Sequence, residues 1–116
     1  KMNNQLPVLD QAVLDKMRND YGEETLVELI DDFKRIGRDS IDGLCKAAKA
    51  DDQKSMTRYA HDLKSSSAVL GLMRLSEQSR KIELASNDGR LQEARSLSTN
   101  LEPSLAAAID TLEGRS

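Results

Sequence analysis

The chain has 116 residues, of which 38% are hydrophobic and 32% charged, and a formal net charge of −3. This length is typical of one compact domain with one core. The mixed charge signs argue against a nucleic-acid surface, because such a surface needs a clustered basic face. No segment approaches the roughly 18 apolar residues of a membrane span, and no signal-peptide pattern is present. We therefore expect a soluble, cytoplasmic protein without membrane contact.

The chain contains one cysteine, Cys45, and one histidine, His61. A single cysteine excludes an internal disulfide, and two such residues are too few for a structural zinc site. Cys45 lies among apolar helical positions, which favours a buried, reduced thiol. The sequence shows no P-loop, no glycine-rich nucleotide loop and no evident cluster of metal-binding carboxylates. We expect no metal and no cofactor bound by the chain itself.

The first half of the chain is predicted to form three helices. The first begins near Asp10 and stops near Gly22. The second begins near Glu23 and carries apolar residues at helical spacing, namely Leu26, Ile30, Phe33, Ile36, Ile41, Leu44, Cys45 and Ala48. The third is expected from about residue 53 to residue 70, with Asp52 as its N-cap and Gly71 as its stop.

The second half is predicted to form two more helices. The fourth carries apolar or small residues at Leu72, Leu75, Ser79, Ile82 and Ala85, before an Asn-Asp-Gly turn at residues 87–89. The last runs from about Arg90 to Leu112, and Pro103 should kink or break it near residues 99–102. Short connections favour antiparallel neighbours. The expected fold is therefore all-α, an up-down-up-down four-helix bundle with an additional short N-terminal helix.

The third predicted helix has two different faces. At about 100° per residue, its buried stripe consists of Met56, Tyr59, Leu63, Ser66 and Leu70. Within about 60° of His61 lie Lys54, Thr57, Arg58, Lys64, Ser65 and Ala68. His61 is therefore expected to face solvent, between three cations and several small residues.

This environment favours a nucleophilic histidine. An exposed neutral imidazole can accept a phosphoryl group, and the added negative charge would be stabilised by Lys64 and Arg58. Transfer requires donor and acceptor to be close and nearly in line. Small neighbours leave that approach open, so we expect a partner to dock on Thr57, Arg58, Ser65 and Ala68.

The segment AHDLKSSSAVLGLMRLSEQSRKIE, residues 60–83, resembles the signature of the histidine-containing phosphotransfer (HPt) domains of bacterial two-component phosphorelays. Their pattern is approximately A-H-x-L-K-G-[SA]-[SA]-x-x-[LVF]-G. The resemblance implies that His61 is the phosphoacceptor and that Lys64 stabilises the phosphoryl group. It also implies that Glu83, on the next helix, is a hydrogen-bond partner of the imidazole. Ser65 stands where the family usually has glycine, which leaves a partner slightly less room.

HPt domains take a phosphoryl group from an aspartate of one receiver domain and pass it to an aspartate of another, without binding ATP. The resemblance therefore implies a phosphorelay intermediate in two-component signal transduction, a monomeric carrier rather than an enzyme. Its expected partners are the receiver domains of response regulators, which would hold Mg²⁺, and a hybrid sensor histidine kinase. Residues 1–116 would form one HPt-like domain with flexible ends at 1–8 and 114–116. It could be free-standing or the C-terminal domain of a hybrid kinase.

Other classes of function remain open from the residues alone. One is a helical interaction module that is not phosphorylated, a degenerate HPt domain. Another is the phosphoacceptor domain of a chemotaxis-type kinase, which receives its phosphoryl group from an ATP-binding domain. A histidine-based hydrolase or metal enzyme ranks last, because it needs convergent acids or further ligands that the sequence does not supply around His61.

Overall fold

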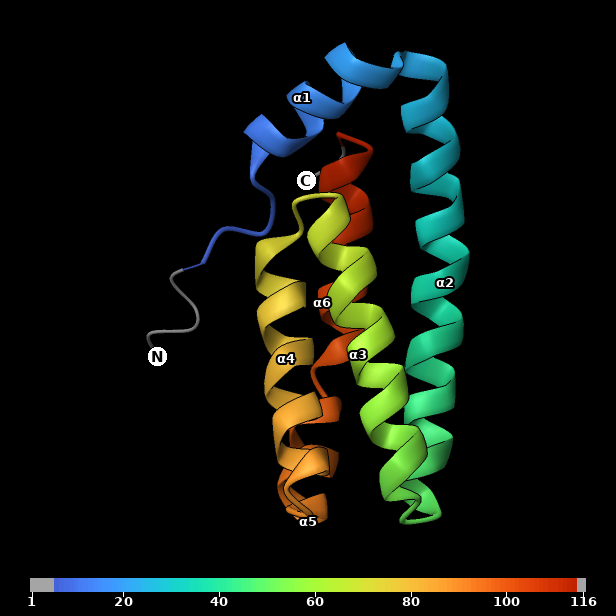
Figure 1. Cartoon of the computed structure of the whole chain (residues 1–116), viewed down its shortest axis with the longest axis vertical. Coiled ribbons are helices and arrows are strands. Elements are labelled where there is room, and N and C mark those ends of the chain that lie inside the picture. Colours follow the sequence, from blue (N-terminus) through green and yellow to red (C-terminus); the bar gives the residue numbers. More distant parts are fainter. Residues whose placement is uncertain (1–5, 115–116) are drawn as a thin grey trace.

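The computed structural model describes residues 6–114, and this part of the chain contains six helices and no strand (Figure 1). Their bounds are α1 Gln11–Tyr21, α2 Glu23–Lys49, α3 Gln53–Val69, α4 Met73–Asn87, α5 Leu91–Ser98 and α6 Leu101–Leu112. Figure 1 shows α2, α3, α4 and the α5–α6 pair alternating in direction along the long axis, while α1 lies across one end. The predicted all-α bundle is confirmed. None of the helices in residues 6–114 is long and apolar enough to cross a membrane.

The predicted flexible ends fall partly outside the described residues, which exclude 1–5 and 115–116. Residues 6–8 belong to the described part of the chain and contact the start of α4. The Arg74 side chain donates a hydrogen bond to the Leu6 carbonyl (2.9 Å), and the Arg74 backbone N–H donates to the Pro7 carbonyl (3.2 Å). Val8 packs against the core. The segment before α1 thus braces the start of α4.

Local side-chain chemistry sets the predicted helix boundaries. The Asp10 carboxylate accepts a hydrogen bond from the Ala12 backbone N–H (3.1 Å) and caps α1. The Asp52 carboxylate does the same for α3, accepting from the Ser55 N–H (3.2 Å) and hydroxyl (2.8 Å). After α3 the chain reverses at Gly71, whose φ of 75° lies in the left-handed region that favours glycine. These starts and stops are confirmed.

The last predicted helix is two helices, because Pro103 interrupts it. Pro103 is the third residue of α6, in the first turn, where a missing N–H breaks no intrahelical hydrogen bond. A continuous helix would bring the proline ring against the carbonyl of Thr99, four residues earlier. The chain avoids this by leaving the helix between Ser98 and Leu101. The break falls inside the predicted interval.

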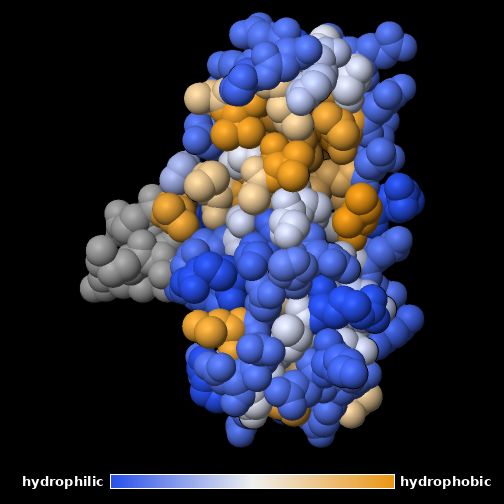
Figure 2. Space-filling model, viewed as in Figure 1, coloured by the Kyte–Doolittle hydropathy of each residue, from blue (hydrophilic) through white to orange (hydrophobic). Residues whose placement is uncertain are grey.

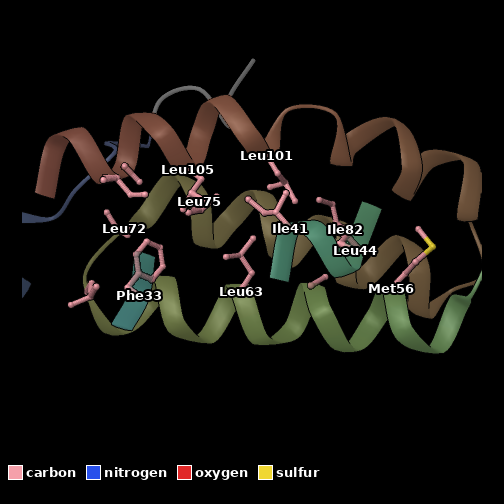
Figure 3. Close-up of a cluster of buried hydrophobic side chains, with 14 of the residues drawn as sticks. Phe33, Ile41, Leu44, Met56, Leu63, Leu72, Leu75, Ile82, Leu101 and Leu105 are labelled. Carbon is pink, nitrogen blue, oxygen red and sulfur yellow. The ribbon is translucent and has the colours of Figure 1, made fainter. Parts of the chain in front are cut away.

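The core lies between α2, α3, α4 and α6, as Figure 3 shows for Phe33, Met56, Leu75 and Leu105. The predicted apolar positions of α4 are all buried. On α3 the buried stripe differs slightly from the prediction. It consists of Met56, Ala60, Leu63, Ser67 and Leu70, while Tyr59 and Ser66 are only half-buried. Two small residues, Ala60 and Ser67, thus take the buried positions that the prediction gave to Tyr59 and Ser66.

Cys45 is exposed, so the prediction of a buried thiol is wrong. The neighbouring Ile41 and Leu44 are buried, and Cys45 lies at the edge of their stripe. There it borders a solvent-filled groove between α2 and α6, together with Leu105. The spacing of apolar residues alone did not show that Cys45 lies at the edge of the buried face rather than in the core.

Two glycines inside α2 allow close approach of other side chains. A Cβ atom at Gly37 would lie 2.9 Å from Leu105 Cδ1 of α6. A Cβ atom at Gly43 would lie only 2.4 Å from Cζ of the Tyr59 ring on α3. The space that these side chains need explains why α2 contains two glycines, although glycine has a low helix propensity.

Candidate functional site

The site rests on the packing of α3 against α4. The residues at this interface are small and fully buried: Ala60 and Ser67 on α3, Ser79 and Ser86 on α4. Hydroxyl groups contribute two of the hydrogen bonds that cross between these helices. The Thr57 and Ser86 hydroxyls lie 2.9 Å apart, and the Ser76 hydroxyl donates to the Lys64 carbonyl (3.1 Å). These contacts fix the register of α4 against α3 on both sides of His61.

His61 faces solvent as predicted, with 55% of its side chain exposed. Its Nδ1 atom lies 2.8 Å from Oε2 of Glu83, on α4. A carboxylate only accepts hydrogen bonds, so we assign the proton to Nδ1 from this contact. Nε2 then carries the free lone pair. The imidazole is thus oriented through one nitrogen and reactive through the other.

Lys64 shares the same carboxylate. Its Nζ atom lies 2.7 Å from Oε1 of Glu83, so the two carboxylate oxygens bind two different residues of α3. Burial of Glu83 raises the pKa of its carboxyl group. The hydrogen bonds from Lys64 and His61 more than offset this, and the net pKa lies below its ordinary value. Glu83 is therefore ionised at neutral pH and keeps both partners in place.

Replacing Glu83 with glutamine should remove an acid-sensitive part of the stability. Because the folded-state pKa of Glu83 is lowered, its contribution is present above the unfolded-state pKa and is lost as pH falls through the folded-state value. Urea unfolding of the wild type and Glu83→Gln at pH 6 and pH 3 measures this. We expect the wild type to be more stable at pH 6 and the difference to shrink at pH 3. A difference that is the same at both pH values would contradict the pairing.

A hollow of about 490 Å³ adjoins the histidine. Its lining residues come from α3 and α4: Gln53, Lys54, Thr57, Arg58, His61, Glu83 and Asn87. The Arg58 guanidinium lies over the Tyr59 ring, 4.5 Å from its centroid. The hollow therefore has cations on the side of His61 that faces the start of α3.

The predicted docking residues differ in their surroundings. Ser65 and Ala68 are exposed, toward the C-terminal end of α3. Arg58 is exposed and borders the hollow. Thr57 also borders it, but its hydroxyl is engaged with the Gln53 carbonyl (3.0 Å) and with Ser86. The docking role of these four residues stays a prediction.

One feature of this face was not predicted, an apolar area beside α1 and the adjoining ends of α2 and α3. Figure 2 shows it above a mostly polar lower half, in the same view as Figure 1. Exposed apolar side chains on these elements include Val27 near the start of α2 (47% exposed) and Val69 at the end of α3 (55%). Val69 directly precedes the buried Leu70, so spacing alone did not separate it from the core stripe.

Comparisons with known proteins agree with this geometry. The model of the Hpt domain family matches residues 28–115. The crystal structure of histidine-containing phosphotransfer protein B (HptB) from Pseudomonas aeruginosa PAO1 is similar, with a TM-score of 0.88 and 24% sequence identity over 95% of each chain. That likeness shows a shared fold. The chain matches no curated protein sequence. In residues 6–114 no group of three or more histidine, cysteine or acidic side chains is placed to hold a metal ion. Because the family match covers most of its length, the chain belongs to the Hpt domain family.

Proposed function

We propose that this chain is a phosphorelay intermediate that accepts a phosphoryl group on Nε2 of His61 from a receiver-domain aspartate and passes it to another. One observation carries the assignment to this atom. The Nδ1–Glu83 hydrogen bond (2.8 Å) fixes the ring and leaves Nε2 free on a half-exposed side chain. His61 is also the only histidine of the chain.

The proposed step needs no proton transfer. The Nε2 lone pair forms a bond to phosphorus while the bond from phosphorus to the aspartate oxygen breaks, and Nδ1 keeps its proton. The product ring is cationic, and its N–H faces the ionised Glu83 carboxylate. In the onward transfer the leaving group is a neutral imidazole, again with its proton on Nδ1. The same contact therefore serves both directions.

Lys64 is proposed to change partners during this cycle. Its ammonium group is bound to Glu83 while the histidine is unmodified. A phosphoryl group on Nε2 brings two negative charges to the same end of the site, and the flexible lysine side chain can turn toward them. Glu83 then keeps the cationic ring as its remaining partner. Lys64 would stabilise the phosphoryl group without being free in the resting state.

The partner is proposed to be a receiver domain that docks over His61. Ser65 and Ala68 leave the approach to the ring open, and the apolar area by Val69 offers surface to bury. Any Mg²⁺ would be held by the receiver. We further propose that the chain acts as a monomeric carrier in the cytoplasm, as one domain.

The test is label transfer from a phosphorylated receiver domain. Receiver domains carrying a ³²P-labelled aspartyl phosphate are incubated with the chain, and the label is followed by gel. We expect rapid transfer to the chain, giving a label that is stable to alkali and labile to acid, as a phosphohistidine is. Binding of receivers without any transfer would instead support an unphosphorylated interaction module.

A further inference from the structure

One cation close to His61, the Arg58 guanidinium, is positioned by a series of contacts that begins at α2. Gly43 of α2 has no Cβ, and the Tyr59 ring occupies the space that a Cβ would need. The ring is half-buried and packs against the core. Tyr59 is thereby fixed on the side of α3 that faces α2.

The fixed ring holds Arg58. The Arg58 guanidinium lies 4.5 Å from the centre of the Tyr59 ring, within range for a cation–π interaction. This contact limits the conformations of a side chain that otherwise has high rotamer entropy. Lys54, one turn earlier on α3, borders the same hollow, and no ring contact involving it is found within residues 6–114. The two cations therefore differ in how firmly they are placed.

The charges around the hollow favour an anionic ligand. Four charged or titratable side chains line it: Lys54, Arg58, His61 and Glu83. The Glu83 charge is offset by Lys64. Within residues 6–114 neither Lys54 nor Arg58 forms an ion pair with a carboxylate, although both cations contribute to lowering the pKa of Asp52, at the start of α3. The hollow thus has two cations available to a partner, next to the reactive ring.

We infer that Arg58, held in place by Tyr59 and Gly43, is a pre-positioned docking cation for the anionic surface around the aspartyl phosphate of a receiver domain. This inference rests on the proposed function and names a residue that sets the affinity for the receiver domain. The occupant follows from charge complementarity, since an aspartyl phosphate and the carboxylates that hold its divalent metal ion together keep a net negative charge when the charge of the ion is included. The sequence suggested that both cations stabilise the phosphoryl group. With Arg58 stacked on Tyr59, we assign that role to Lys64 alone, and Arg58 acts on encounter and affinity.

The experiment measures the rate of transfer against the concentration of a receiver domain that labels the wild type, together with the Kd of the same receiver. For Arg58→Ala we expect the half-saturating concentration and the Kd to rise about three- to tenfold, and the salt dependence to weaken. The rate at saturation and the lifetime of the phosphohistidine should not change. Lys54→Ala is the matched control for a cation without a stacking partner, and its effect should be smaller.

Variants of Tyr59 test whether the ring contact that positions Arg58 matters, while the charge of Arg58 is left in place. Tyr59→Phe keeps the ring and should behave as the wild type. Tyr59→Leu keeps apolar packing but loses the π face, and it should reproduce part of the Arg58→Ala effect; circular dichroism confirms that it folds. Unchanged affinity in Arg58→Ala would overturn the inference, as would equal effects of Lys54→Ala or a lowered rate at saturation. Failure of the proposed function looks different, because the wild type itself would then take no label.

Discussion

His61→Gln is expected to abolish phosphoryl acceptance while leaving the fold intact. A glutamine amide is not a nucleophile, and the chain has no second histidine to take over. The side chain is 55% exposed and contributes little to packing, so the free energy of unfolding should change by no more than about 0.5 kcal/mol. Label transfer from a phosphorylated receiver, combined with urea unfolding, measures both quantities on the same preparation.

The neighbours of His61 provide graded controls for this loss. Lys64→Ala and Glu83→Ala keep the nucleophile but remove charge stabilisation and ring positioning, so we expect transfer to slow by roughly ten- to a hundredfold. Both should still yield an acid-labile label. An alkali-stable, acid-labile label on His61→Gln at the wild-type level would contradict the assignment of His61.

The largest effect on stability is expected for Gly71→Ala, at the turn between α3 and α4. Gly71 has φ 75°, where an alanine costs about 1–2 kcal/mol. An added Cβ would also lie 2.8 Å from the Val13 Cβ and 2.9 Å from the Asp10 carbonyl oxygen. Overpacking of this kind costs about 1–3 kcal/mol. We expect a total loss of about 2–5 kcal/mol, measured by urea unfolding.

Gly89→Ala is the matched control. Gly89 also has a positive φ, 82°, but no other atom lies within 4 Å of its hypothetical Cβ. Gly89→Ala should therefore lower the free energy of unfolding only by the cost of an alanine at positive φ, about 1–2 kcal/mol. Equal losses at the two positions would show that contact with α1 does not matter at Gly71.

Features that depend on residues near in sequence could be predicted well. The predicted cap at Asp52 acts on a backbone group three residues away, so it is visible in the sequence, and the first helix begins near Asp10 as predicted. The break before Pro103 is also local. The solvent exposure of His61 followed from helical spacing, because the apolar residues of α3 lie on the other side of the helix.

Features that depend on packing between helices could be predicted only in part. Glu83 lies 22 residues from His61, and only the family resemblance linked the two. No local pattern showed that Lys64 would bind the same carboxylate. The exposure of Cys45 depends on how far α6 covers α2, and the Tyr59–Gly43 contact depends on the spacing of α2 and α3. Such distances follow from the assembled bundle.

The most direct measurement for the central claim is the position of the phosphoryl group on the imidazole ring. NMR spectra of the freshly phosphorylated chain, both phosphorus–proton and nitrogen spectra, distinguish a phosphoryl group on Nε2 from one on Nδ1. The Glu83 contact at Nδ1 predicts a single signal from phosphate on Nε2 of His61. Phosphate on Nδ1, or on a carboxylate, would contradict the account of how this site works.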